Sequence, residues 1–215
     1  MTAAPVFRKL GLCIFPESIM GYALRDEKRY TYGDYRHWPE DVRYELIDGA
    51  AFLMAPAPSL DHQTLAGEVF HQIRTALEGN PCRVLMAPVD VLLSRRDCTD
   101  DEVDTVLQPD VLVVCDSGKL TPRGVRGAPD WVLEVISPSS ASHDQIVKLA
   151  AYERAGVKEY WLAHPTDKVL TIYHHDGTAF GRPRIVDLSG ETPVAVLPGV
   201  VVRWEPVVSR FLPQA

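Results

Sequence analysis

The stretch "DWVLEVIS" (residues 130–137) decides the fold when it is combined with "EYWLAHP" (residues 159–165). Each stretch is a short apolar run typical of a buried strand. The segment between them predicts a helix, in which Ile146, Leu149 and Tyr152 supply much of the packing and Gly156 marks the end. A strand, a helix and a second strand in this order predict a parallel pair of strands joined by a right-handed crossover.

Further elements extend this unit into a larger sheet. A hairpin is expected over residues 44–56, because Asp48 and Gly49 form a turn pair between two apolar runs. A long helix is expected from Ser59, its N-cap, to Gly79. Three more strands are expected over residues 82–94, 106–116 and 169–175.

This order of elements predicts an α/β fold with a central mixed β-sheet flanked by helices. We expect residues 1–38 of the 215-residue chain to form an irregular N-terminal arm. Residues 39–215 are expected to form a single domain with a strand-rich C-terminal extension over residues 176–215. The aromatic residues within 22–38 could pack on a second copy of the chain, so a homodimer is a hypothesis.

Composition limits the possible functions. The net charge of −7 argues against a protein that binds DNA through its global charge, so a nucleic-acid role would need a local basic surface or metal ions. No apolar run approaches the length that spans a bilayer, and the N-terminal residues do not resemble a signal peptide. We therefore expect no membrane partner.

The four cysteines also bear on the location of the protein. They are scattered, without a CxxC pair or histidines at zinc-ligand spacing, at Cys13, Cys82, Cys98 and Cys115. Cys115 lies in an apolar run and is interpreted as a small core residue. These features predict a reducing, cytoplasmic location.

Two acidic residues interrupt or adjoin the predicted strands. Glu134 lies in the middle of the first quoted stretch, and an unpaired charge buried there would be costly. Asp110 follows Pro109, which disfavours the middle of a ladder and could open the sheet at that point. If the two strands are neighbours, both carboxylates can meet at one sheet end, where Mg²⁺ would relieve their repulsion. The alternatives are a solvated or paired Glu134 and an Asp110 that only begins a strand.

The predicted helix after Glu134 contributes a second group of candidates. Asp144, Lys148 and Tyr152 lie at i, i+4 and i+8, on one helix face. Lys148 could orient or deprotonate a water, or stabilise a pentavalent phosphate. Alternatively, Asp144 and Lys148 form an exposed pair with Tyr152 packed beneath.

Residues outside this helix supply the remaining candidates. Glu45 could belong to the site or be a hairpin-edge charge, and His62 could be its polar neighbour or a solvated residue at a helix start. The loop over residues 117–129 carries three basic residues and no acid, and it either contacts phosphates or only aids solubility. Its basic residues are Lys119, Arg123 and Arg126.

The combined motifs over residues 40–175 resemble the Uma-two family, a bacterial group of candidate restriction endonucleases within the PD-(D/E)xK nuclease superfamily. They include "RYELIDG" (43–49), "VLQPDVLVV" (106–114), "GAPDWVLEVISPSS" (127–140) and "DQIVKLAAYERAGVKEYWLAHP" (144–165). The resemblance implies a restriction-endonuclease-like fold and hydrolysis of phosphodiester bonds in DNA with Mg²⁺ or Mn²⁺.

The resemblance also implies roles for individual residues. Asp110 matches the acid of the PD element, and Glu134 matches the acid of (D/E)xK, with the backbone carbonyl of Val135 as a further metal ligand. Ile136 stands where the motif has lysine, and Lys148 is the candidate for a lysine that has moved to the helix.

Two further catalytic residues are carried over from the resemblance. Tyr152 completes a K-x-x-x-Y spacing similar to the Q-x-x-x-Y of exonuclease branches, and Glu45 resembles an early core acid of such nucleases.

Two other classes of function remain open from the sequence. The altered (D/E)xK element and the acidic composition are compatible with a nuclease fold that has lost turnover and acts as a protein- or nucleic-acid-interaction module. A metal hydrolase of another phosphate ester is the third class. An assay with DNA and a divalent metal separates the first class from the second, and a panel of small phosphoesters identifies the third.

Overall fold

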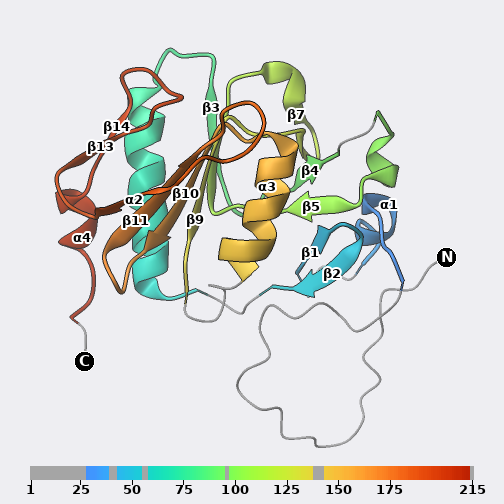
Figure 1. The fold of residues 1–215 in the computed structure, drawn as a ribbon, viewed down its shortest axis with the longest axis horizontal. Helices are drawn as coiled ribbons and strands as arrows, with labels where there is room; N and C mark the ends of the chain where they lie inside the picture. Colours follow the sequence, from blue (N-terminus) through green and yellow to red (C-terminus); the bar gives the residue numbers. More distant parts are fainter. Residues whose placement is uncertain (1–27, 39–42, 55–57, 95–96, 138–142, 214–215) are drawn as a thin grey trace, which may run out of the picture.

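The computed structural model describes residues 28–38, 43–54, 58–94, 97–137 and 143–213 (Figure 1). Within these ranges, the strands form two six-stranded sheets and one two-stranded sheet. We call the sheet with the strand order β12-β11-β10-β9-β6-β3 the central sheet, and the sheet with the order β2-β1-β5-β4-β8-β7 the outer sheet.

The strands of the central sheet are β12 (Arg184–Asp187), β11 (Val169–His174), β10 (Glu159–His164), β9 (Trp131–Val135), β6 (Val111–Val114) and β3 (Arg83–Met86). Those of the outer sheet are β2 (Ala50–Leu53), β1 (Tyr44–Ile47), β5 (Thr105–Leu107), β4 (Val91–Leu93), β8 (Gly124–Arg126) and β7 (Leu120–Thr121). The two-stranded sheet joins β13 (Glu191–Pro193) and β14 (Val201–Arg203).

The helices are α1 (Tyr32–Tyr35), α2 (Leu60–Ala76), α3 (Leu149–Ala155) and α4 (Glu205–Val208). Two 3₁₀ turns, η1 (Asp100–Glu102) and η2 (Ser117–Lys119), and a π-helical segment, η3 (His143–Lys148), accompany them. None of the helices in the described ranges is long and apolar enough to cross a membrane.

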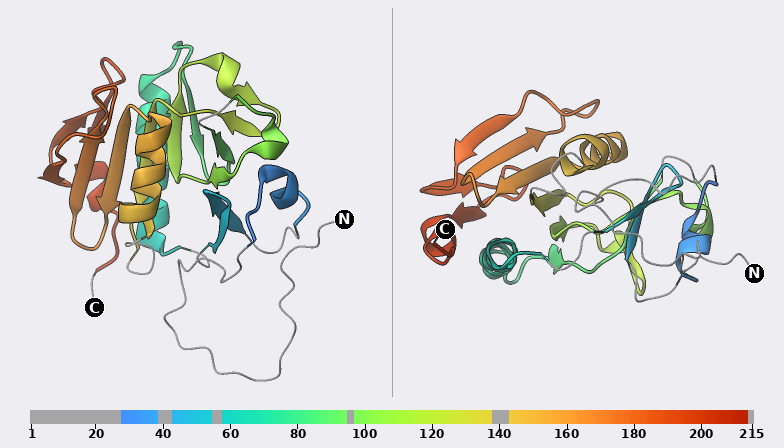
Figure 2. Two further views of the ribbon diagram at one scale, coloured as in Figure 1. Left: turned by 45° about the vertical axis from the view of Figure 1, so that its right-hand side comes forward. Right: turned by 90° about the horizontal axis from the view of Figure 1, so that it is seen from below.

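The predicted strand–helix–strand unit is confirmed. β9 and β10 pair in parallel, with Trp131 opposite Glu159, and every other strand pair of the central sheet is antiparallel. The two faces of this sheet carry different helices, because neighbouring residues of a strand point to opposite faces. Leu133 packs in a core with α2, whereas Val132 packs in a core with α3. Figure 2 shows α2 and α3 on opposite sides of the central sheet, as expected for a mixed sheet flanked by helices.

Two of the predicted strands are wrong as continuous elements. Residues 82–94 divide into β3 of the central sheet and β4 of the outer sheet, and residues 106–116 divide into β5 of the outer sheet and β6 of the central sheet. Pro88 and Pro109 lie at the two breaks, and a proline has no N–H to continue a ladder. Asp110 therefore stands at the start of β6, where the chain passes from one sheet to the other.

The described part of the expected N-terminal arm packs within the chain, while residues 1–27 lie outside the described ranges. Trp38 makes edge-to-face ring contacts with Tyr30 and Tyr44, at centroid distances of 5.1 and 5.0 Å. These three rings are buried in a cluster with Leu46 and Val106 of the outer sheet. The aromatic side chains of residues 30–38 therefore stabilise this chain's own core, where aromatic pairs add to the burial of apolar area.

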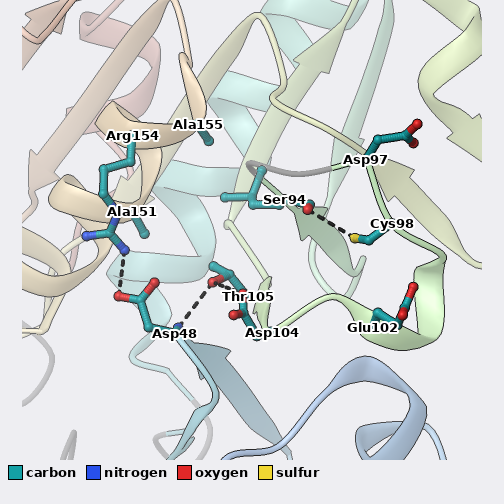
Figure 3. Close-up of a pocket in the computed structure, with 11 residues that line it drawn as sticks. Asp48, Ser94, Asp97, Cys98, Glu102, Asp104, Thr105, Ala151, Arg154 and Ala155 are labelled. Atoms are coloured by element: carbon teal, nitrogen blue, oxygen red, sulfur yellow. Dashed lines mark hydrogen bonds and ion pairs between the residues drawn. The ribbon is translucent and has the colours of Figure 1, made fainter.

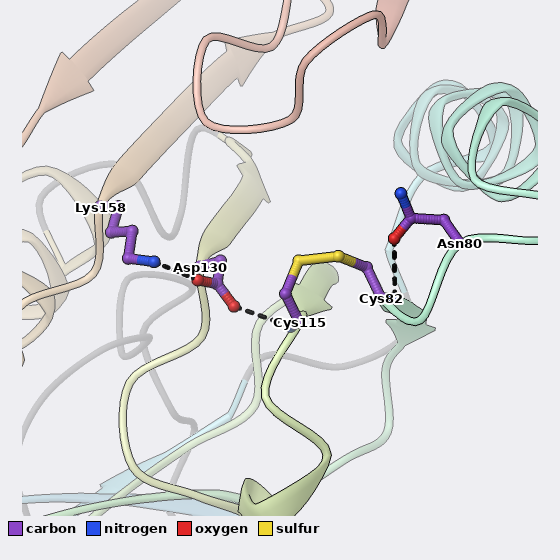
Figure 4. Close-up of a disulfide and its surroundings, with 5 residues drawn as sticks. All are labelled: Asn80, Cys82, Cys115, Asp130 and Lys158. Carbon is purple, nitrogen blue, oxygen red and sulfur yellow. Dashed lines mark hydrogen bonds and ion pairs between the residues drawn. A yellow bond between two sulfur atoms is a disulfide. The ribbon is translucent and has the colours of Figure 1, made fainter.

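A disulfide joins Cys82, directly before β3, to Cys115, directly after β6 (Figure 4). The Cys115 N–H donates to one carboxylate oxygen of Asp130 at 2.7 Å, and the other oxygen pairs with Lys158 at 2.6 Å. The interpretation of Cys115 as merely a small core residue is wrong, because the register of β3 and β6 brings the two cysteines opposite each other. This end of the central sheet is thus linked covalently and by charge-assisted hydrogen bonds.

One glycine fixes how the β7–β8 hairpin sits on the outer sheet. Gly124 has φ +148°, and a Cβ at this position would lie 2.2 Å from the carbonyl oxygen of Asp90. We expect Gly124→Ala to lower the free energy of unfolding by roughly 2–3 kcal/mol, because the clash is with backbone and the φ value is unfavourable for other residues. Urea denaturation followed by tryptophan fluorescence measures the change.

Gly67→Ala is the matched control for this substitution. Gly67 lies inside α2, and a Cβ added there would have no atom within 4 Å, so the same change should raise stability by about 0.5–1 kcal/mol. Equal effects of the two substitutions would contradict the close approach of Gly124 to Asp90.

Candidate active site

Asp110 and Glu134 lie on one face of the central sheet, at one end. β6 pairs antiparallel with β9, with Val111 opposite Leu133. Extending this register by one residue places Asp110 opposite Glu134, and residues directly opposite share a face. One carboxylate oxygen of Asp110 also accepts the backbone N–H of Val135 at 2.8 Å. The two acids that stand out in the sequence therefore occur side by side.

Lys148 extends from η3 into a group of buried carboxylates. Its Nζ lies 3.0 Å from Glu45 Oε1, 3.2 Å from Glu134 Oε1 and 3.3 Å from Asp144 Oδ1. Lys148 is 5% exposed and Glu134 is 3% exposed, so these contacts are shielded from water. A buried ammonium is tolerated only when it is paired, and here three carboxylates share it. The alternative of an exposed Asp144–Lys148 pair is therefore wrong.

Glu45 brings the outer sheet to this cluster. Glu45 lies on β1 and is buried, so of the two alternatives from the sequence it is not an exposed charge at the hairpin edge. Its Oε1 accepts the backbone N–H of Gln108 at 2.9 Å, and its Oε2 lies 3.3 Å from His143 Nε2. Glu45 thus connects β1, the crossing between β5 and β6, and η3. Both of its carboxylate oxygens have partners, as buried carboxylates require.

Tyr152 approaches the cluster from α3. Its hydroxyl donates to Glu134 Oε1 at 2.9 Å, and its ring is fully buried. Burial raises the pKa of Tyr152 well above its ordinary value, and the carboxylate of Glu134 raises it further. The phenol therefore stays protonated and acts as a hydrogen-bond donor to Glu134.

The pKa values of the two buried glutamates are shifted in opposite directions. Burial alone would raise the pKa of Glu45, but the ammonium of Lys148 and the donors described above lower it from 4.5 to about 2. Burial raises the pKa of Glu134 well above 4.5; Lys148 opposes this rise, and the neighbouring acids add to it. Glu45 is therefore the ionised partner of Lys148, and Glu134 is the acid that holds a proton most strongly.

Two histidines complete the cluster. His62 Nε2, near the start of α2, lies 3.3 Å from Asp110 Oδ2, so His62 is a polar neighbour of the site rather than a solvated residue. The sequence did not predict His143 as a site residue. Its position directly before Asp144, in the helix that follows Glu134, was a signal that could have identified it. Both Nδ1 atoms are buried and have no hydrogen-bond partner in the described part of the chain.

The three basic residues of the predicted phosphate-binding loop differ in their surroundings. Lys119 donates to the carbonyl of Ala128 at 2.8 Å. Arg126 forms an ion pair with Asp100 at 3.0 Å and donates to the carbonyl of Cys98 at 2.9 Å. Arg123 is exposed in the turn between β7 and β8. Lys119 and Arg126 therefore have clear structural partners, and phosphate binding by this loop stays a prediction.

The donor set at Asp110 and Glu134 fits a hard divalent cation. Both offer carboxylate oxygens on one face, and the single charge of Lys148 balances only one of the three acids that share it. Mg²⁺ needs only one or two protein carboxylates, because it keeps waters and binds substrate phosphate oxygens. No group of three or more His, Cys, Asp or Glu side chains in the described ranges is arranged to hold a metal ion.

A cavity of about 580 Å³ is lined by residues outside this cluster (Figure 3). Thr105 of β5 and Ala151 and Arg154 of α3 line it, whereas Asp110, Glu134 and Lys148 do not. Several of its polar groups contact one another: Asp48 pairs with Arg154 at 2.8 Å, and its N–H donates to Thr105. The residues that line this cavity are therefore different from those of the carboxylate cluster.

Comparison with known proteins identifies the family and the fold. The fold is restriction-endonuclease-like, and the family model described as "Putative restriction endonuclease" (Uma2) matches residues 32–205. The chain belongs to the Uma2 family. No curated protein matches the sequence. A solved structure, a putative nuclease belonging to DUF820 from Anabaena variabilis ATCC 29413, is similar with a TM-score of 0.66 and 17% identity, covering 83% of this chain and 97% of that chain.

The opposite pKa shifts of Glu45 and Glu134 predict that their substitution changes the pH dependence of the free energy of unfolding in opposite ways. The raised pKa of Glu134 favours the folded protein at low pH, and this contribution is lost as pH rises above 4.5. Glu134→Gln should therefore gain stability relative to wild type as pH rises above 4.5. The gain is at most about 1.4 kcal/mol per pH unit. Glu45 contributes stability above pH 4.5 that is lost as pH falls toward 2, so Glu45→Gln should be destabilised at pH 7 and approach wild type in acid.

Chemical denaturation between pH 3 and 8 measures both effects, with Glu78→Gln as the control. Glu78 is exposed just after α2, so its substitution should leave the pH dependence unchanged. If the stability of both buried variants relative to wild type changes with pH in the same direction, the opposite pKa shifts of Glu45 and Glu134 are wrong.

Proposed function

We propose that this member of the Uma2 family is a Mg²⁺- or Mn²⁺-dependent endonuclease that hydrolyses phosphodiester bonds in DNA. One observation carries the proposal: Asp110 and Glu134 lie side by side on one sheet face, with the ammonium of Lys148 3.2 Å from Glu134. Two oxygen ligands with an amine beside them suit the binding of a divalent cation and a phosphate. The family description and the nuclease fold of the similar structure support the same class of activity.

In this proposal, Asp110, Glu134 and the backbone carbonyl of Val135 hold the metal ion. When bound, such an ion polarises a phosphate and lowers the pKa of a coordinated water. The N–H of Val135 fixes the orientation of Asp110, and the hydroxyl of Tyr152 fixes that of Glu134. Both ligands are thereby held before substrate arrives, which lowers the reorganisation that the reaction needs.

Lys148 acts as a charge stabiliser rather than as a base. Burial alone would lower the pKa of Lys148, but Glu134, Glu45 and Asp144 raise it well above its ordinary value. An amine that stays protonated cannot accept a proton from water, but it can stabilise negative charge on the phosphate. Glu45 positions this ammonium through the 3.0 Å contact. The replacement of the motif lysine by Ile136 fits this arrangement, because Ile136 is buried in the core beside α3.

A second candidate function is a nuclease-fold protein without turnover that binds nucleic acid or protein. The burial of Glu134 and Lys148 favours it, since both groups are paired within the protein and little exposed. A hydrolase of another phosphate ester would use the same groups on a smaller substrate. Activity measurements distinguish these possibilities.

The test of the metal ligands uses plasmid, linear duplex and single-stranded DNA, and RNA, with Mg²⁺ or Mn²⁺ and with EDTA. We expect metal-dependent cleavage of DNA by the wild type and none by Asp110→Ala or Glu134→Ala, because each change removes an oxygen ligand. Asp97→Ala, at an exposed position, should retain full activity. Cleavage that survives both ligand substitutions would refute the site, and hydrolysis only of small phosphoesters would identify the third class.

The role of Lys148 can be separated from that of Tyr152. Lys148→Met should slow cleavage by about 10²–10³-fold, because it removes a group that stabilises charge in the transition state. Tyr152→Phe should slow it by no more than about tenfold, since it removes one hydrogen bond to Glu134. Thermal unfolding of both variants controls for loss of fold, and Lys148→Met/Glu45→Gln restores charge balance if the single variant is unstable. Equal rates for the two single variants would contradict these roles.

A further inference from the structure

A second cavity, of about 490 Å³, opens at the β3 edge of the central sheet. Its polar lining consists chiefly of Tyr35, Arg83, Asp90, Gln108 and Arg123. Leu85, Pro88, Leu120 and Pro122 supply apolar surface. No residue proposed as a metal ligand lines it, so it is a separate feature of the surface.

This cavity adjoins the carboxylate cluster on the same face of the sheet. Leu85 pairs with Leu112, and Leu112 lies two residues after Asp110, so all three side chains point to one face. Leu85 lies one strand away from Leu112, and Asp110 lies two residues before Leu112 on β6. In ideal sheet geometry, this places the Cα atoms of Leu85 and Asp110 about 8 Å apart. Gln108 belongs to both features, because its side chain lines the cavity and its backbone N–H donates to Glu45. Adjacent phosphates of one nucleic-acid strand could therefore reach both.

The wall between the two features is held rigidly by hydrogen bonds. The side-chain nitrogen of Gln108 donates to the Tyr35 hydroxyl at 3.0 Å and to Asp90 Oδ1 at 2.8 Å, and its oxygen accepts from the guanidinium of Arg43. The Tyr35 hydroxyl also donates to Asp90 at 3.1 Å. A network in which these groups are satisfied presents a fixed surface, and a preformed surface lowers the entropy lost on binding.

The charge of the cavity is opposite to that of the protein as a whole. Arg83 and Arg123 are exposed and line it from β3 and from the β7–β8 turn, whereas Asp90 is its single acidic lining residue and is used by Tyr35 and Gln108. The other cavity, by contrast, has four acidic lining residues and one basic residue. In a chain of net charge −7, two arginines on a concave surface form a local site for phosphate. The Tyr35 ring and the apolar residues suit a sugar or base.

We propose that this cavity binds a nucleotide of the substrate strand, next to the phosphodiester that is cleaved, with Arg83 and Arg123 contacting its phosphates. The inference rests on the proposed nuclease function and specifies how the strand is held. It also assigns Arg123, alone among the three basic loop residues, to the phosphate-binding surface. Gly124 fixes the turn that carries Arg123 against the backbone of Asp90, since the N–H of Val125 donates to the Asp90 carbonyl at 2.8 Å.

The test measures binding of a fluorescein-labelled single-stranded DNA oligonucleotide by anisotropy, in EDTA and at salt concentrations from 0.1 to 1 M. Arg83→Ala/Arg123→Ala is compared with Arg182→Ala/Arg184→Ala, which removes the same charge at exposed positions in and beside β12, at the opposite edge of the central sheet. Loss of two phosphate contacts should reduce the slope of log K against log salt by about 1.4. The affinity of the Arg83→Ala/Arg123→Ala variant, divided by that of the control variant, should therefore be about 25-fold lower at 0.1 M salt than at 1 M salt.

Equal slopes and affinities for the two double variants would overturn the proposal. Displacement of the oligonucleotide by the mononucleotide dTMP at comparable concentrations would also overturn it, because the cavity would then hold a free nucleotide rather than part of a strand. Dependence of binding on Arg83 and Arg123, with weak competition by dTMP, supports it.

Cleavage by the wild-type protein with Mg²⁺, measured in parallel, separates this inference from the proposed function. If the wild type cleaves DNA but the two double variants bind alike, the cavity assignment fails and the nuclease function stands. If the wild type cleaves no nucleic acid but binding depends on the two arginines, the nuclease function fails and the cavity remains a strand-binding site.

Discussion

The ammonium of Lys148 among buried carboxylates is the interaction on which the rest of the site depends. Without it, Glu45, Glu134 and Asp144 would place like charges together in a shielded environment, which is strongly unfavourable. With it, the pKa of Glu45 is lowered to about 2, and the rise that burial causes in the pKa of Glu134 is opposed. The π-helical segment that carries Lys148 follows the strand of Glu134, and local deviations of this kind are frequent at functional sites.

The fold creates this interaction by bringing two sheets together at one point. The chain leaves the outer sheet at β5 and enters the central sheet at β6, and the crossing places Asp110 beside β9 and Gln108 beside Glu45. Strand β1 then supplies a carboxylate from the outer sheet to a lysine that packs on the central sheet. The acids therefore occupy the junction of the two sheets, to which both sheets contribute side chains and where Glu45 and Glu134 are buried.

Much of this arrangement could be predicted from the sequence, and the remainder depended on tertiary contacts. The parallel pair of β9 and β10 followed from local periodicity, and the neighbouring positions of Asp110 and Glu134 followed from adjacent strands. Pro109 indicated an opening of the sheet, but the sequence could not show that the chain passes between two sheets at Pro88 and Pro109, because apolar runs look alike in either sheet. It also gave no indication that Cys82 lies opposite Cys115, since that pairing depends on the register of β3 and β6. The contact between His143 and Glu45 spans 98 residues, beyond any local pattern.

The distribution of the cluster along the chain has a consequence for biosynthesis. Its members come from β1, the start of β6, β9 and η3, so more than a hundred residues separate the first from the last. A nascent chain that has emerged only as far as β9 lacks the ammonium, and a fragment that begins after β1 lacks its ionised partner. Such incomplete polypeptides contain uncompensated acids in place of an assembled centre. The complete set of side chains in this centre is therefore present only once the chain has been made through η3.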